Sequence, residues 1–305
     1  MPVFRSITCL SLALCAAIVA GCRDRHAGDV PRGDTTRFAV VRDDYGRDVT
    51  LRARPTRIVS LNPATTELLF AIGAGGRLVG RTRYDLWPDS ARLVPDLGPG
   101  MRPNLEAVLG ARPDLVVLYA SADDRAAADR LTAAGVATVA FRMDRVADFR
   151  RVTELLGRLA GDTARARAVV DSVSATLDRV RRATESAHRP TVFFHAWEKP
   201  LITIGGGSFL SELVTLAGGR NVYDSLTVPS ATVTLEDVVR RDPDIVLVSP
   251  VEREKLLSSE RWRSVRAVRE GRVLAYDTNL VARPSVKLGE AAASLAALLH
   301  PAALR

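Results

Sequence analysis

Hydrophobic positions divide this chain into short apolar runs and longer stretches with helical periodicity. Residues 114–118 (DLVVL) and 244–248 (DIVLV) are aliphatic runs typical of strands covered on both faces of a parallel sheet. Each run follows a helical pattern that opens at a good N-cap residue, Asn104 or Thr234, and closes before a Pro-Asp pair. Alternating helices and buried strands predict an α/β fold.

The chain contains two copies of this helix–turn–strand pattern. Residues 104–118 (NLEAVLGARPDLVVL) and 234–248 (TLEDVVRRDPDIVLV) share six identical positions, each pair separated by 130 residues. The segments 69–80 (LFAIGAGGRLVG) and 213–223 (LVTLAGGRNVY) precede them, and each predicts a helix that ends at glycine before another short strand. Two motifs in the same order predict two related α/β lobes with parallel sheets.

The stretch between the two copies, residues 144–187, lacks proline and has the periodicity of a helix. Its apolar positions recur every three or four residues, as one helical face requires: Val169, Val170, Val173, Leu177 and Val180. Gly161 and Asp162 should divide it into two helices, the second about 24 residues and roughly 36 Å long. We therefore predict a stiff connection with limited lobe closure, and this organisation: N-terminal lobe 39–143, helical linker 144–187, C-terminal lobe 188–305.

The first residues of the chain predict export. One basic residue and an apolar stretch of roughly a dozen residues, too short to span a membrane, are typical of a secretory signal. The stretch ends in VAGC, which resembles the bacterial lipobox, so we predict removal of residues 1–21 and lipidation of Cys22; the alternative is an ordinary signal peptide that contains cysteine. Cys9 and Cys15 would be removed, leaving no disulfide. Residues 22–38 are polar and predict a flexible tether.

The formal net charge of +8 does not indicate a nucleic-acid partner. Arginine outnumbers lysine 40 to 3, and the arginines alternate with Asp and Glu instead of clustering with aromatic residues. Such mixing is typical of a solvated surface, so we expect no nucleic acid among the partners.

The order of motifs resembles the helical-backbone solute-binding proteins of ABC importers for vitamin B12, ferric siderophores and haem. The resemblance covers residues 40–301 and is carried by RDDYGRDVTL, RIVSLNPATTELLFAIGA, PNLEAVLGARPDLVVL, TLEDVVRRDPDIVLV and ARPSVKLGEAAASLAALLHP. Within that family the cobalamin-binding subfamily is most similar, through NPATTELLFAIG, GM before NLE, and the arginine of LVARPS. It implies a monomeric, membrane-anchored extracytoplasmic lipoprotein that delivers a corrinoid to a permease dimer with its ATPase, without a prosthetic group or resident metal.

The resemblance gives the repeated glutamates a role. Glu106 and Glu236 stand at the second helical position of each copy, where the family's glutamates pair with arginines of the membrane permease, one per lobe. From the residues alone, a glutamate at a helix start could equally serve only to complement the helix dipole.

The resemblance also places the ligand between the lobes, beside the carboxyl ends of the strands. The residues expected to contact it are Pro63, Ala64, Tyr84, Gly100, Met101 and Tyr119 of the first lobe, and Trp197, Glu198, Ser230 and Arg283 of the second. Aromatic walls suit a large, partly apolar macrocycle, although each aromatic could equally be core packing.

Two departures, each a missing tryptophan, keep an iron chelate, either a ferric siderophore or haem, open as the ligand. Ser230 stands where the enterobacterial cobalamin binder has tryptophan. The loop GPGMRPN is two residues longer than its counterpart and lacks the tryptophan before the glycine. The paired cysteines of that protein are both absent, so its disulfide is lost as a unit, which says nothing against function.

An enzyme and a free ligand sensor are the other classes of protein that the sequence has to exclude or leave open. The sequence contains no Gly-x-Ser-x-Gly elbow and no phosphate-binding loop ending in Gly-Lys-Ser/Thr. No histidine has metal-ligand spacing, and His195 is expected to be a satisfied, half-buried histidine on a strand and not a haem ligand. An enzyme on this fold would need a titratable cluster, for which Glu198, His195 and Asp277 are the candidates. We expect no enzyme; a secreted ligand sensor without a transport role stays open.

Overall fold

A computed structural model of the chain describes residues 37–281 and 283–301. The predicted signal, residues 1–21, and the lipidation site Cys22 lie outside the described residues, as does most of the tether. Among the helices that the structure describes, none combines the length and apolarity needed to cross a membrane.

The N lobe is built on a four-stranded parallel sheet in the order β4-β3-β5-β6, as predicted. Its strands are β3 (Ile58–Ser60), β4 (Leu78–Gly80), β5 (Leu115–Tyr119) and β6 (Ala137–Phe141), preceded by the antiparallel pair β1 (Ala39–Arg42) and β2 (Asp48–Leu51). Its helices are α1 (Pro63–Ala71), α2 (Leu105–Gly110) and α3 (Arg125–Ala133), with 3-10 turns η1 (Gly75–Arg77) and η2 (Asp89–Leu93).

The C lobe has a mixed sheet in the order β10-β8-β7-β11-β12, with β9 also pairing with β7. Its strands are β7 (Thr191–Trp197), β8 (Ile202–Ile204), β9 (Arg220–Asn221), β10 (Ser230–Thr232), β11 (Ile245–Val248) and β12 (Val273–Ala275). Its helices are α6 (Phe209–Leu216), α7 (Leu235–Arg241), α8 (Pro250–Ser258) and α9 (Arg266–Arg269), with the 3-10 turn η3 (Trp262–Ser264).

The C-lobe sheet departs from the all-parallel prediction at one edge. β9, β11 and β12 belong to the parallel part, whereas β8 pairs antiparallel with both β7 and β10. β7 reverses into β8 through only four residues, and a connection that short can join only antiparallel strands.

The repeat seen in the sequence is also a repeat in space. β5 pairs with β3 so that Leu115 lies opposite Ile58, and β11 pairs with β7 so that Ile245 lies opposite Val192. Leu115 and Ile245 are the first strand residues of the two copies. In both copies the residue before the proline has a positive φ, 47° in one and 43° in the other. The prediction of two related lobes is therefore confirmed at the level of strand register.

The aspartate of each Pro-Asp pair ties its strand to the strand beside it. The Asp114 carboxylate accepts hydrogen bonds from the N–H and hydroxyl of Thr56 at 2.7 and 2.9 Å. Asp244 accepts the same two bonds from Thr191 at 2.9 and 2.8 Å. Although burial opposes it, the hydrogen bonds from Thr191 and Arg266 lower the pKa of Asp244 to about 2. The pattern predicted only a turn here, but the acid also aligns the sheet.

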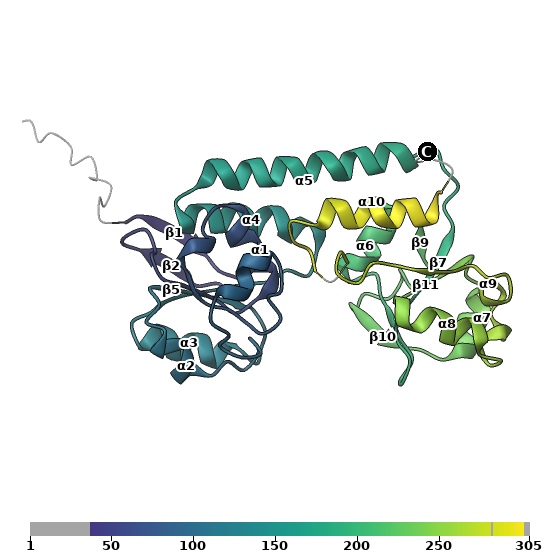
Figure 1. The fold of residues 1–305 in the computed structure, drawn as a ribbon, viewed down its shortest axis with the longest axis horizontal. Coiled ribbons are helices and arrows are strands. Elements are labelled where there is room, and N and C mark those ends of the chain that lie inside the picture. The colour runs from purple at the N-terminus through teal and green to yellow at the C-terminus, as the bar shows by residue number, and fades with distance from the viewer. Residues whose placement is uncertain (1–36, 282, 302–305) are drawn as a thin grey trace, which may run out of the picture. The chain divides into compact units, whose positions relative to one another are not determined.

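The linker forms two helices, α4 (Val146–Ala160) and α5 (Thr163–Thr184), as predicted. Gly161 adopts the left-handed conformation that ends α4, and the Asp162 side chain accepts from the Arg165 N–H to begin α5. α5 is 22 residues long. It packs along α4 and along the last described helix, α10 (Leu288–Leu299), as Figure 1 shows.

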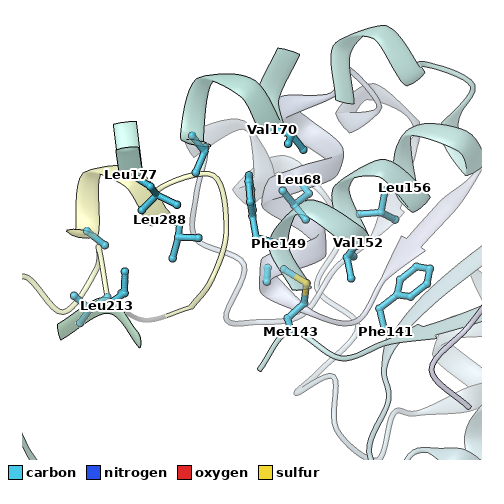
Figure 2. Packing of buried hydrophobic residues seen from close by; sticks show 14 of the residues in the cluster. Leu68, Phe141, Met143, Phe149, Val152, Leu156, Val170, Leu177, Leu213 and Leu288 are labelled. Carbon is cyan, nitrogen blue, oxygen red and sulfur yellow. The ribbon is translucent and has the colours of Figure 1, made fainter. Parts of the chain in front are cut away.

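A continuous hydrophobic core connects the two lobes through these helices (Figure 2). Leu68 of α1 belongs to the same buried cluster as Val152 of α4 and Val170 of α5. Leu288 of α10 and Leu213 of α6 continue it toward the C lobe. The long helix is therefore one wall of a shared interior, and limited lobe closure stays a prediction.

Candidate functional site

The buried carboxylate of Asp85 holds the loop that follows β4 in place. Asp85 accepts hydrogen bonds from the Thr66 hydroxyl at 2.6 Å and from the Thr82 hydroxyl and N–H at 2.5 and 3.1 Å. Burial raises the pKa of Asp85, and these hydrogen bonds act against that rise. The loop thereby holds Tyr84, whose side chain is 55% exposed, at the carboxyl end of the strand.

The glycine-rich loop lies beside this one. The Arg83 N–H donates to the Gly98 carbonyl at 2.9 Å, joining the two loops. Gly100 has a φ of +82°, and a Cβ there would lie 2.7 Å from the Leu61 carbonyl oxygen. Gly100 is buried, so its close approach is to the protein interior, whereas the neighbouring Met101 is 56% exposed.

The first turn of α1 contains two predicted ligand contacts, Pro63 and Ala64, and they differ in exposure. Asn62 caps this helix and accepts from the Ala64 N–H at 3.0 Å. The Ala64 side chain is only 2% exposed and belongs to the core, so neither its methyl group nor its N–H is available to a ligand. The prediction of a ligand contact at Ala64 is not supported, because the helix turns this position inward. Pro63, the first helical residue, is partly exposed.

Tyr119 ends β5 with its hydroxyl already engaged. This hydroxyl donates to the Asp144 carboxylate at 2.6 Å. Burial and the bond to Asp144 together raise the pKa of Tyr119 well above its ordinary value. The phenol of Tyr119 is therefore neutral at physiological pH and braced against the segment that leads into α4.

Arg283 is anchored to the N lobe by a residue that the sequence reading overlooked. Its guanidinium Nη1 donates to the Glu67 carboxylate of α1 at 3.0 Å, and Ser285 donates to the other carboxylate oxygen. The Glu67 side chain is 5% exposed and that of Arg283 is 29% exposed. Burial raises the pKa of Glu67, and Ser285 and Arg283 act against that rise. The available signal was a single carboxylate inside the apolar helix PATTELLFA, which needs a buried partner.

On the C lobe, a pocket of about 590 Å³ opens at the carboxyl ends of β7, β11 and β12. Trp197, the last residue of β7, lines it and is 63% exposed, with its indole N–H donating to the Lys199 carbonyl at 3.0 Å. The other lining residues are His195, Ala196, Glu198, Lys199, Ser249, Val251, Glu252, Lys255, Tyr276 and Thr278. The pocket thus combines one large exposed aromatic with several charged groups.

Glu198 forms the polar wall of this pocket. Its carboxylate lies 2.8 Å from His195 Nε2 and 3.4 Å from the indole nitrogen of Trp262, which donates to it. The prediction that His195 is a satisfied histidine on a strand is confirmed, but its side chain is 1% exposed and is therefore fully buried, not half-buried. Asp277 is not part of this cluster, because its carboxylate accepts from the Asn279 N–H in a turn of its own.

Ser230 begins the edge strand β10, where it is exposed and lies opposite Ile204 of β8. Among the described residues, no group of three or more His, Cys, Asp or Glu side chains is placed to hold a metal ion.

The repeated glutamates lie on the surface at matching places. Glu106 is the second residue of α2 and Glu236 the second residue of α7, and both side chains are exposed. Within the described part of the chain, neither takes part in an ion pair. Hydrogen bonds from its own N–H and from Thr234 lower the pKa of Glu236.

Similar proteins agree with this architecture. A substrate-binding lipoprotein of an ABC transporter, the uncharacterised YvrC of Bacillus subtilis, is 28% identical over 95% of this chain and 96% of its own length. A cobalamin-binding protein of Halobacterium salinarum is 30% identical over 83% of this chain and 71% of its own. The haem-binding protein RhuT of Roseiflexus has the same fold, with a TM-score of 0.72, 24% identity and coverage of 81% and 98%.

Residues 58–280, which run from β3 to just beyond β12, match the family described as periplasmic binding protein. The chain therefore belongs to the periplasmic binding protein family, and it is a substrate-binding protein of transport and not an enzyme.

Proposed function

We propose that this chain is the extracytoplasmic solute-binding lipoprotein of an ABC importer and that its ligand is cobalamin or another corrinoid. The observation that carries the ligand class is the pair of exposed aromatic side chains at the carboxyl ends of the strands, Tyr84 in one lobe and Trp197 in the other. Trp197 also lines the C-lobe pocket, and large aromatic surfaces that a folded protein leaves exposed suit a wide, partly apolar ligand. The name of the relative from Halobacterium supports the same class.

Arg283 would contribute polar contacts at the rim of such a ligand. Glu67 engages one guanidinium nitrogen, Nη1, and the side chain stays partly exposed. A guanidinium has five N–H donors, so a partner on one nitrogen leaves donors for the amide or phosphate oxygens of a corrinoid. Met101, with its flexible thioether, would add an adaptable apolar contact from the N lobe.

A titration of the protein that begins at Arg23 with cyanocobalamin tests this proposal. Tryptophan fluorescence and calorimetry should report saturable binding tighter than about 1 μM, which is about −8 kcal/mol. Trp197→Ala should weaken it at least tenfold, measured by calorimetry, which does not depend on the fluorescence that this variant loses. The absence of binding would contradict the corrinoid proposal.

An iron chelate is the second candidate ligand. Lys199 and Lys255 at the pocket, with Arg283, would suit the carboxylates of haem or of a siderophore. Haem and a ferric siderophore should therefore be titrated in parallel, and tighter binding of either would favour it over cobalamin.

Docking on the permease is the second part of the proposal. Glu106→Arg together with Glu236→Arg should abolish uptake and leave ligand affinity unchanged, because the two side chains are exposed on helices that contribute no residue to the C-lobe pocket. Unchanged uptake would favour a secreted sensor.

Metabolic labelling with palmitate, compared between the native chain and Cys22→Ala, tests the lipid anchor.

A further inference from the structure

One carboxylate in the C-lobe pocket is held by two buried side chains. Glu198 Oε2 lies 2.8 Å from His195 Nε2, and Glu198 Oε1 accepts from the indole N–H of Trp262 at 3.4 Å. The side chains of His195 and Trp262 are buried, whereas that of Glu198 is 27% exposed and lines the pocket. Because a carboxylate only accepts hydrogen bonds, His195 must carry its N–H on Nε2. The fold therefore fixes the Glu198 carboxylate at the pocket wall.

These two donors do not saturate the Glu198 carboxylate. Its two oxygens offer about four lone-pair sites, so about half of them remain for further partners. Arg261 lies 3.8 Å from Oε1, too far for a hydrogen bond, and its side chain is largely exposed. The remaining lone pairs are available to N–H or O–H donors of a bound ligand. Because Glu198 is already fixed, it can accept these bonds without the ordering cost of a flexible side chain.

The other charged groups of the pocket are less constrained. Glu252 and Lys255 pair with each other at 2.8 Å within α8, so their charges offset each other. Lys199 is exposed and forms no ion pair within the described part of the chain, so its flexible ammonium can follow a ligand anion without fixing its place. Among the charged residues that line the pocket in the described part of the chain, only Glu198 is anchored by buried side chains.

We propose that Glu198 sets the ligand class of the pocket by accepting hydrogen bonds from ligand amides and by excluding ligand carboxylates. This inference rests on the corrinoid proposal above and deepens it. The rim of a corrinoid carries neutral amide side chains with N–H donors, whereas the rim of haem carries two carboxylates, which only accept. A ligand carboxylate beside Glu198 would face a like charge and leave both groups without a donor. The same residue thus favours one candidate ligand and opposes the other.

Trp197 brings the rim of a ligand within reach of this carboxylate. It precedes Glu198 in the chain, lines the same pocket and is 63% exposed. Its indole N–H is already engaged by the Lys199 carbonyl, so the ring offers its apolar face to a ligand. A flat macrocycle packed on that face would place its polar rim beside the neighbouring side chain. The indole therefore suits either macrocycle, and Glu198 distinguishes between them.

The test compares two ligands that differ in one group. Cyanocobalamin and its monocarboxylic acids, in which one side-chain amide is hydrolysed, share the macrocycle and the metal. Calorimetry at pH 7 with the chain that begins at Arg23 measures the affinity for each. The native chain should bind at least one acid isomer roughly tenfold more weakly than cyanocobalamin, because that acid faces Glu198. Glu198→Gln keeps an oxygen for His195 and gains an N–H, so it should bring the two affinities within about twofold of each other.

Glu252→Gln is the matched control, because it removes an equal charge from the same pocket. The Glu252 carboxylate already pairs with Lys255, so this variant should keep the native preference for the amide. An equal loss of preference in both variants would assign the selection to the net charge of the pocket and not to Glu198. Thermal unfolding verifies the fold of each variant, and the comparison of the two ligands on the native chain needs no variant.

The outcomes separate this inference from the proposal on which it rests. If the native chain binds cyanocobalamin and every acid isomer equally, the corrinoid proposal holds and the role of Glu198 is wrong. If the native preference persists in Glu198→Gln, another group makes the selection, and the role of Glu198 is again wrong. If the native chain binds no corrinoid, the ligand proposal fails, and the selection of amides fails with it.

Discussion

Glu67 and Glu212 occupy matching positions in the two lobes but lie in different surroundings. Each belongs to a helix, α1 or α6, that ends before a glycine with positive φ. Glu67 binds Arg283 and Ser285, which precede α10, whereas Glu212 accepts from the Val146 N–H at 2.6 Å and pairs with Arg145 at the start of α4. Each glutamate thus binds the segment of the chain that leads into a helix of the shared core.

The difference between them is burial. The Glu67 side chain is 5% exposed and that of Glu212 is 26% exposed. A buried carboxylate depends on its partner to offset lost hydration, whereas a partly solvated one can use water in its place. The comparison teaches that glutamates at matching helix positions can depend on their partners to different degrees, because the tertiary environment sets how deeply each is buried.

The largest difference is expected when the arginine of each tie is removed. Arg283→Ala removes the charge partner of the buried Glu67 and leaves it only the Ser285 hydroxyl, so we expect the free energy of unfolding to fall by about 3 kcal/mol. Arg145→Ala leaves Glu212 with the Val146 N–H and with water, so we expect a fall of about 1 kcal/mol or less. Urea unfolding of both variants measures this, and equal losses would show that burial does not distinguish the two ties.

The pH dependence of stability should reveal Glu67 in particular. Burial raises the pKa of Glu67 above its ordinary value of 4.5, against the opposing effects of Ser285, Arg283 and Lys287, and the nearby Asp85 adds to the rise. The folded state therefore favours the protonated acid. Its contribution to stability is complete below pH 4.5 and is lost as pH rises through the raised pKa.

Glu67→Gln removes this loss, because its side chain does not ionise. The stability of the variant relative to the native chain should therefore improve as pH rises from about 4 toward neutrality. Urea unfolding of both proteins at several pH values measures the relative curve. Parallel curves would contradict the raised pKa, whatever the absolute stability of the variant.

The aspartates of the two repeat strands give a smaller contrast. Asp114 and Asp244 make the same bonds to a threonine, but Asp244 also pairs with Arg266 at 3.1 Å. We expect Asp244→Asn to lower the free energy of unfolding by about 1 kcal/mol more than Asp114→Asn, discounted for partial exposure. The pKa of about 2 means that this advantage is present above pH 3.8 and is lost as pH falls toward 2. Equal losses near pH 7 would assign no role to Arg266.

These contrasts also separate the features of the fold and site that can be predicted from the sequence from those that cannot. Helix ends, the break at Gly161 and the buried strands were predictable, because glycine, proline and hydrophobic period act locally. The sequence repeat alone predicted that Glu106 and Glu236 lie at the second position of matching helices. The tie between Glu67 and Arg283 was not predictable, because its residues are 216 positions apart. Ala64 shows the same limit, since the motif that contains it indicates a site but not which side chains turn inward.

The smallest expected effect lies in the C-lobe tie. Glu212→Gln removes the charge that pairs with Arg145 but keeps an oxygen to accept from the Val146 N–H, so we expect a loss of only about 0.5 kcal/mol. Because both partners are partly exposed, salt should screen them, and the loss should vanish in 1 M NaCl. A double-mutant cycle between Glu67 and Arg283 should keep its coupling energy in the same salt, because those charges meet where little solvent reaches. If both couplings fall together with salt, the two ties are equally solvated, and burial no longer explains why matching glutamates differ.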